Sequence, residues 1–274
     1  MLYICPTPIG NLEDITLRTI KVLQSVDVIA CEDTRHSMIL LNHLGINKKT
    51  VSLHEHNERK KSAQIVEMLK TGLNAAYISD AGMPCISDPG FILLNEVKKA
   101  NLPYTVLPGA SAQVTAFVGA NVSDKGYFFV GFLPYSSKDR TDFLQTYKNF
   151  EFPIIIYEAP HKIKKTLNDI YKIWGNRKFT IAREITKKFE EYIDTDIETM
   201  LLHLDDYEIR GEFILVFNPP VKKAKYDTPD IEKILKKYID SGLKSKDIIS
   251  ETIKETGCSK NEIYALYLKI KDEV

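Results

Sequence analysis

Short runs of β-branched and aromatic residues alternate with longer amphipathic stretches along the first half of the chain. The runs predict strands at 2–5, 27–30, 51–53, 75–79 and 104–107, and the stretches predict helices at 16–25, 35–44, 58–70 and 88–100. Strands that alternate with helices in this way are typical of an α/β fold with largely parallel pairing. We therefore predict an N-terminal α/β domain over residues 1–121.

The pattern changes in the second half, where fewer helices separate the strands. Strands are predicted at 127–132, 154–157, 179–182, 191–194 and 211–217, which indicates a second α/β domain with a mixed sheet over residues 122–221. The stretch 218–230 is rich in proline and charge and predicts a linker. Helical periodicity follows, with turns at Gly242 and at 257–259, so residues 222–274 predict a small helix-turn-helix-like extension.

The charge balance and the cysteine content exclude some classes of protein. Lys plus Arg and Asp plus Glu number 37 each, so any nucleic-acid site must be a local patch rather than a whole-molecule field. The four cysteines include no CxxC pair, which favours a reducing compartment over a disulfide framework or a zinc site. We find neither a basic leader nor an apolar run near the roughly 20 residues that span a bilayer, so we expect a cytoplasmic protein without membrane contact.

The loops that follow predicted strands are the candidate ligand sites. The chain has no GxG, GxGxxG or GKS/GKT motif, so a nucleotide-like ligand must use other loops. Open α/β sheets bind ligands at such loops, here 6–11, 30–36, 79–90 and 107–112. Gly82 and Gly109 leave room for a ligand against bare backbone, and Asp88 with Pro89 predicts a helix start. The alternative is that each loop is only a connection made of turn residues.

Charged clusters give further candidates. Glu32, Asp33, Arg35 and His36 follow one strand and could combine acid/base chemistry with phosphate contacts, or could be helix N-terminal acids beside a solvated face. Thr34 is the predicted N-cap of the helix there, and Gly45 its C-cap. Basic clusters surround Lys162 and Lys165 and follow Arg183, although surface helices are often this basic. The pair of histidines at 54 and 56 lacks metal-ligand spacing, and we predict no metal site.

Taken together, the loop motifs resemble those of one family. The segments, in order, are PTPIGNLEDIT, CEDTRHS, LHEHNE, SDAGMPCISDPG, LPGASA, GFLP, YEAPHK, AREITK and RGEFILV. They resemble the tetrapyrrole (corrin/porphyrin) methylase superfamily, and within it the group that methylates small-subunit ribosomal RNA. The helical tail from about residue 222 is also similar to the extension of that group. Lys162 stands where the group has an arginine, which keeps the charge but loses the bidentate fork.

This resemblance implies a two-domain fold that binds S-adenosylmethionine in the cleft between the domains, and a homodimer. The implied cofactor-binding residues in the first domain are Pro8, Asp80, Ala81, Gly82, Pro108, Gly109, Ser111 and Ala112. Those in the second domain are Phe132, Tyr157, Glu158, Ala182, Gly211, Glu212 and Phe213.

The resemblance also implies the reaction, which is 2'-O-methylation of a cytidine ribose in the decoding region of 16S ribosomal RNA, within the assembled small subunit. We assign the substrate-side chemistry to Glu32, Asp33, Arg35 and His36, and RNA contacts to Arg18, Arg35, Lys162, Lys165, Arg183 and the C-terminal helices. Two rival functions remain. One is a sister enzyme on the same fold that methylates a tetrapyrrole or a protein side chain, and the other is a non-catalytic RNA-binding assembly factor.

Overall fold

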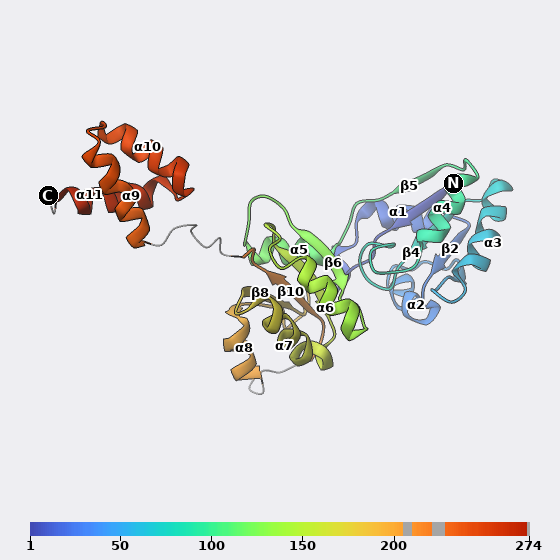
Figure 1. The fold of residues 1–274 in the computed structure, drawn as a ribbon. Coiled ribbons are helices and arrows are strands. Elements are labelled where there is room, and N and C mark those ends of the chain that lie inside the picture. Colours follow the sequence, from blue (N-terminus) through green and yellow to red (C-terminus); the bar gives the residue numbers. More distant parts are fainter. Residues whose placement is uncertain (205–209, 221–227, 273–274) are drawn as a thin grey trace. The chain divides into compact units, whose positions relative to one another are not determined.

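A five-stranded parallel sheet forms the first part of the molecule (Figure 1). The computed structural model describes residues 1–204, 210–220 and 228–272. The sheet has the order β3-β2-β4-β1-β5, with β1 (Leu2–Cys5), β2 (Val28–Cys31), β3 (Lys49–Ser52), β4 (Ala75–Ile78) and β5 (Tyr104–Val106). The intervening helices are η1 (Leu12–Asp14), α1 (Leu17–Ser25), α2 (Thr34–His43), α3 (Glu58–Lys70) and α4 (Phe91–Lys99). The predicted α/β fold class is confirmed.

Helices cover both faces of this sheet because its inner strands β1, β2 and β4 are apolar on both sides. Ile4 packs in a buried cluster with Ile65 of α3, on the face that α4 also covers. Its neighbour Cys5 points to the opposite face, in a cluster with Leu23 of α1 and Leu41 of α2. Strands buried on both faces read as nearly continuous apolar runs, which is why the sequence pattern identified them.

The starts of two helices differ from the sequence prediction. The N-cap of α2 is Asp33 rather than Thr34, because the Asp33 carboxylate accepts the Arg35 backbone N–H at 2.8 Å. Gly45 lies one residue beyond the C-cap, with a φ of 66°. Such a left-handed residue after a helix end suits glycine.

The start of α4 was predicted at Asp88 and Pro89, and this is wrong. The helix begins at Phe91, and its N-cap is Gly90 with a φ of 118°. The capping carboxylate comes from Glu58, 32 residues earlier, whose Oε1 accepts the backbone N–H groups of Gly90 and Ile92 at 2.8 Å each. A buried Glu58, 6% exposed, thus replaces the local cap that the sequence suggested.

A second, mixed sheet follows in the order β6-β7-β10-β8-β9 (Figure 1). Its strands are β6 (Phe128–Phe132), β7 (Ile154–Glu158), β8 (Lys178–Arg183), β9 (Glu191–Asp196) and β10 (Phe213–Phe217). Among the described strands of this second sheet, only β6 and β7 pair in parallel. The helices are α5 (Ala112–Ala120), α6 (Ser137–Thr146), η2 (Pro160–Lys162), α7 (Ile163–Trp174) and α8 (Ile197–His203). This agrees with the mixed sheet expected from the sequence.

The helix α5 packs on the second sheet rather than the first. Its Ala116 lies in a buried cluster with Ala182 of β8 and Ile214 of β10. Helices α6, α7 and α8 cover the other face, around Phe179 and Leu215. The domain boundary at residue 121 stays a prediction, and this packing favours a crossing between the sheets before α5.

Residues 228–272 form a compact unit of their own. Three helices, α9 (Thr228–Asp240), α10 (Ser245–Thr256) and α11 (Lys260–Asp272), enclose a core that includes Leu235, Ile248 and Ile263. Most of the predicted linker, at 221–227, lies outside the described residues. Among the helices described here, none combines the length and the apolar character that crossing a membrane requires.

Candidate active site

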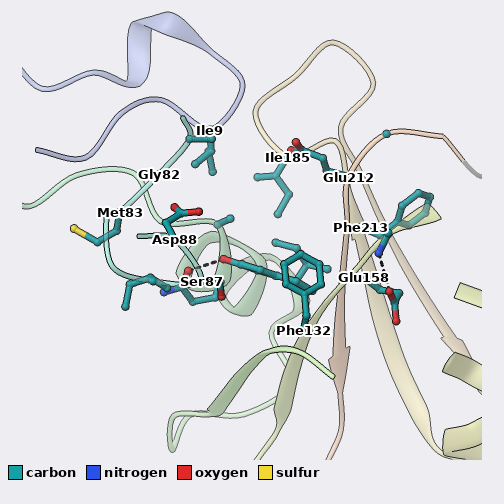
Figure 2. Close-up of a pocket in the computed structure, with 18 of the residues that line it drawn as sticks. Ile9, Gly82, Met83, Ser87, Asp88, Phe132, Glu158, Ile185, Glu212 and Phe213 are labelled. Carbon is teal, nitrogen blue, oxygen red and sulfur yellow. Dashed lines mark hydrogen bonds between the residues drawn. The ribbon is translucent and has the colours of Figure 1, made fainter. Parts of the chain in front are cut away.

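A cavity of about 370 Å³, which we call the central cavity, lies where loops of the first sheet meet those of the second. Figure 2 shows Ile9 and Gly82 on one side of it and Ile185 and Glu212 on the other. The Asp88 carboxylate faces the space between them (Figure 2). The loops of the first sheet follow the carboxyl ends of β1 and β4, the usual position of a ligand site in an open α/β sheet.

Hydrogen bonds join these two loops. Thr7 and Gly82 exchange backbone hydrogen bonds at 2.9 and 3.1 Å, and the Thr7 hydroxyl donates to the Ser79 carbonyl at 3.1 Å. The Ser79 hydroxyl in turn donates to the Gly82 carbonyl at 3.1 Å. These hydrogen bonds hold Gly82, which lines the central cavity, in place, so this part of the wall needs little ordering when a ligand binds.

The loop at 79–90 also has an unusual backbone. Cys85 and Ser87 adopt left-handed φ values of 68° and 61°, and Gly82 has a φ of 80°. Non-glycine residues in this region cost free energy, and they concentrate at functional sites where the surroundings hold them in place. Here the Glu58 carboxylate holds the end of the loop at Gly90.

Three carboxylates gather at this edge of the first sheet. Burial, with the neighbouring charges of Glu32 and Asp80, raises the pKa of Asp88 to about 7. Burial also raises the pKa of Glu32, and Asp80 adds to that effect. The Asp80 carboxylate accepts the backbone N–H of Asp33 at 3.2 Å, which ties the loop after β4 to the loop after β2. Asp88 is therefore only partly ionised near neutral pH, as suits a group that accepts and releases a proton.

The second sheet contributes polar groups that are held by their own partners. The Tyr157 hydroxyl donates to the Gln113 side-chain oxygen at 2.8 Å, which links β7 to the start of α5. The buried Glu158 accepts the Ala159 backbone N–H at 2.8 Å and the Thr166 hydroxyl at 2.5 Å. These groups give the mostly apolar cavity a few fixed polar positions, which is the usual character of a small-molecule site.

The predicted cofactor-binding residues fall into three groups. Those that line the central cavity are Ala81, Gly82, Ala112, Phe132, Tyr157, Glu158, Gly211, Glu212 and Phe213. Pro8 and Asp80 line a neighbouring cavity that His36 also lines, which we call the His36 cavity. The remaining four, which line neither cavity, are Pro108, Gly109, Ser111 and Ala182.

Gly109 has a different structural role from the one expected of it. A Cβ at this position would overlap the Pro6 ring, so the missing side chain allows two loops to pack together. A larger residue at 109 would therefore disturb the fold before it could act on a ligand. Gly82 does line the central cavity. A Cβ added at Gly82 would lie 3.1 Å from the Ile9 side chain, which is its nearest neighbour.

The predicted catalytic residues do not line the central cavity. Asp33 caps α2 and forms an ion pair with Arg35 at 3.0 Å, and the Arg35 side chain is 91% exposed. His36 lines the His36 cavity. Glu32 lies near enough to Asp88 to raise its pKa. Asp88, which the sequence suggested only as a helix cap, does line the central cavity, together with Glu158 and Glu212.

The predicted RNA-contacting residues lie in different surroundings. Arg18 and Arg35 are exposed on α1 and α2. Lys162 and Lys165 line a third cavity beside the central one. The Arg183 side chain is 12% exposed and has partners within the protein. It forms an ion pair with Glu191 at 2.6 Å and donates to the Arg210 carbonyl. The structure therefore does not favour an RNA contact through Arg183.

Sequence reasoning missed several residues of the central cavity besides Asp88. Ile9, Met83, Gln113 and Ile185 line it as well. Ile9 and Met83 belong to the loops 6–11 and 79–90, which the sequence analysis had already named as candidate ligand sites, so these two residues could have been predicted. Ile185 belongs to the AREITK segment, which carried the family resemblance but was not expected to supply this side chain to the cavity.

The fold and this loop arrangement match one known family. Residues 1–201 match the model of the Tetrapyrrole (Corrin/Porphyrin) Methylases. The chain belongs to this family. The resemblance seen in the loop motifs is thereby confirmed, and so is the prediction of a methyltransferase.

Two relatives of this methylase have high similarity over nearly the whole chain. Both are named Ribosomal RNA small subunit methyltransferase I. The protein from Halalkalibacterium halodurans is 38% identical, over 97% of this chain and 94% of its own length. The protein from Bacillus subtilis is 39% identical over the same shares of the two chains.

A solved structure with the same fold is a Uroporphyrin-III C-methyl transferase from Thermus thermophilus, complexed with S-adenyl homocysteine. It aligns with a TM-score of 0.58 and 13% identity over 79% of this chain and 96% of its own. At this identity the similarity supports the fold of the methylase.

Proposed function

We propose that this methyltransferase transfers a methyl group from S-adenosylmethionine to the ribose 2'-hydroxyl of a cytidine in the decoding region of small-subunit ribosomal RNA. The relatives that match almost the full chain at 38% and 39% identity support the ribosomal RNA substrate. The observation that carries the chemistry is Asp88, whose carboxylate faces the central cavity with a pKa of about 7.

The central cavity suits S-adenosylmethionine, which is the methyl donor. Its size of about 370 Å³ lies within the range of small-molecule sites. Ile9, Phe132 and Ile185 offer apolar walls for an adenosine, and Glu212 places a carboxylate where a cationic ligand would be favoured. When bound, the donor supplies a methyl group on a positively charged sulfur.

Asp88 would act on the other reactant. A ribose hydroxyl is a weak nucleophile near neutral pH, and a carboxylate that accepts its proton as the new O–C bond forms accelerates the attack. The joined loops around Thr7 and Gly82 keep the Asp88 loop in place, so alignment of the reacting groups contributes as well. The proton passes from the hydroxyl oxygen to the Asp88 carboxylate and then to solvent.

The substrate assignment predicts where a labelled methyl group will be found. Purified protein should transfer label from S-adenosylmethionine to small subunits that lack the modification, more readily than to naked RNA. A neutral protein with only local basic clusters needs a structured target that aligns many weak contacts. The labelled nucleotide should resist alkaline cleavage on its 3' side, because the attacking 2'-oxygen is capped. Label on a base, on protein or at a position that alkali still cleaves would overturn the ribose assignment.

Two rival functions predict other outcomes. A sister enzyme for tetrapyrroles or protein side chains would leave ribosomal RNA unlabelled and would transfer label to one of those substrates. A non-catalytic assembly factor would bind the small subunit but not S-adenosylmethionine, which titration calorimetry measures directly.

Deleting residues 221–274 should weaken methylation by about tenfold at limiting small subunit while leaving S-adenosylmethionine affinity unchanged. The described residues that line the central cavity belong to the first 220, and the helices α9, α10 and α11 have a core of their own. The deleted tail carries 12 Lys against 10 Asp and Glu from residue 222 on, so it would recognise shape rather than bulk charge. Steady-state kinetics and calorimetry of the truncated protein check both parts. Full methylation by the truncated protein would show that the tail does not contribute to substrate recognition.

Two further expectations come from the sequence analysis. We expect a homodimer, which light scattering measures, and a cytoplasmic location, which fractionation measures.

A further inference from the structure

A cavity of about 380 Å³ adjoins the central cavity and shares Phe132 and Glu158 with it. We call it the Tyr135 cavity, because Tyr135, Lys162 and Lys165 line its other side. These three side chains are exposed, so the cavity is open to solvent on that side. A ligand in the Tyr135 cavity would therefore lie directly beside a molecule bound in the central cavity.

Two exposed aromatic rings mark this cavity. Tyr135 is 87% exposed and Phe132 is 58% exposed, so neither ring is explained by burial in the core. The ammonium group of Lys162 lies 5.3 Å from the centroid of the Tyr135 ring, a cation–π arrangement. Exposed rings beside cations are the typical platform on which proteins stack the bases of single-stranded nucleic acid.

The backbone that carries Tyr135 is held in place by a buried arginine. Arg140 is 7% exposed, and its guanidinium donates to the carbonyls of Pro134 and Tyr135 at 3.1 Å each. An ion pair at 2.8 Å with Asp169 of α7 neutralises the Arg140 charge. An exposed ring on an immobilised loop loses little entropy when a ligand stacks on it.

The two lysines are available to bind an anion. Lys162 and Lys165 are exposed, and neither forms an ion pair within residues 1–204, 210–220 and 228–272. They stand at the start of α7, three residues apart, so their side chains extend from one face of the helix. This spacing suits two contacts along one phosphodiester segment.

We propose that the Tyr135 cavity binds an unpaired nucleotide of the RNA next to the methylated one. Its base stacks on Tyr135 and Phe132, and its phosphates contact Lys162 and Lys165. This proposal rests on the proposed function, because the cavity adjoins the one assigned to the methyl donor. The methylated ribose must reach the central cavity. Because Phe132 lines both cavities, the next nucleotide along the RNA would then lie in the Tyr135 cavity.

The test compares Tyr135→Ala with wild type in methyl transfer to small subunits that lack the modification. Loss of the ring should lower kcat/KM about tenfold, mainly through KM, and leave S-adenosylmethionine affinity unchanged. Tyr135→Phe should stay within about twofold of wild type, because it keeps the stacking face. Tyr171→Ala is the matched control, since Tyr171 is also exposed, at 37%, on α7 but lies outside the cavity.

The lysine contacts have a readout of their own. Lys165→Ala should reduce the slope of log KM against log salt by about 0.7, the value for one phosphate contact with single-stranded nucleic acid. Lys172→Ala, an exposed lysine further along α7, should leave the slope unchanged.

The outcomes separate this proposal from the proposed function. If wild type labels the RNA while Tyr135→Ala keeps its kcat/KM, the nucleotide site is overturned and the function stands. An unchanged salt slope in Lys165→Ala would remove the phosphate contact at that residue. If wild type labels no RNA at all, the proposed function fails and the nucleotide site fails with it.

Discussion

Replacement of Asp88 by Asn is expected to lower the turnover of methyl transfer by about 10²–10⁴-fold, the usual contribution of a general base. The amide has the same shape but accepts no proton, so the ribose hydroxyl would attack without assistance. Affinity for S-adenosylmethionine should stay within about threefold if Asp88 serves the hydroxyl rather than the donor. Single-turnover methyl transfer and calorimetry measure the two quantities separately.

The pH dependence of the wild-type enzyme should follow the same group. Burial and the charges of Glu32 and Asp80 raise the pKa of Asp88 to about 7, and only the ionised carboxylate can accept a proton. The value of kcat/KM should therefore rise with pH and level off above about pH 7, because it reports groups of the free enzyme. Asp88→Asn should abolish this rise.

Asp142→Asn is the control for this prediction, because Asp142 is exposed on α6 and does not line the central cavity. A large rise in the donor dissociation constant of Asp88→Asn would instead assign the carboxylate to binding of the cationic donor. Retained turnover in Asp88→Asn, together with its loss in Glu32→Gln, would return the base to the cluster that the sequence suggested.

Replacement of Glu58 by Ala should lower the free energy of unfolding by about 3 kcal/mol, the upper part of the range for hydrogen bonds to a charged group. The change leaves the N–H groups of the buried Gly90 and the half-buried Ile92 without their acceptor at the start of α4. Urea unfolding followed by circular dichroism measures the global effect. Hydrogen exchange at Ile92 should also accelerate by at least about tenfold, because local opening exposes that amide.

A residue on the same helix serves as the control. Glu67→Ala removes an exposed ion pair with Lys70, and exposed pairs contribute about 1 kcal/mol or less. Glu58→Gln keeps one side-chain oxygen as acceptor and should cost less than Glu58→Ala. Equal stability of Glu58→Ala and Glu67→Ala would show that another group caps α4.

The Glu58 cap also restricts the motion of the candidate site. The loop at 79–90 ends at Gly90, so loosening this end should give Asp88 more conformational freedom and slow methyl transfer in the folded variant. The effect should be smaller than that of Asp88→Asn, because the carboxylate itself is retained.

The sequence alone determined where the strands of both sheets and the helices between the strands of the first sheet lie, and which family the chain resembles. These properties are local: a strand buried on both faces is apolar throughout, and a helix such as α3 repeats its apolar residues at a period that survives in any tertiary context. Loop motifs are also continuous in the chain, which is why SDAGMPCISDPG, LPGASA and the other segments, taken in their order, indicate the family.

Tertiary structure alone decided which residues of those loops face the same space. Glu58 caps a helix whose N-cap residue, Gly90, lies 32 residues later, and Gly109 serves the packing of Pro6. Asp88, read as a helix cap in the sequence, is a carboxylate at the central cavity. Burial raises its pKa, and the charge of Glu32, which lies 56 residues earlier in the chain, adds to that effect. No local pattern encodes how close two such residues lie after folding. Burial and charge proximity arise only when the sheets assemble, and they set the chemistry of the site.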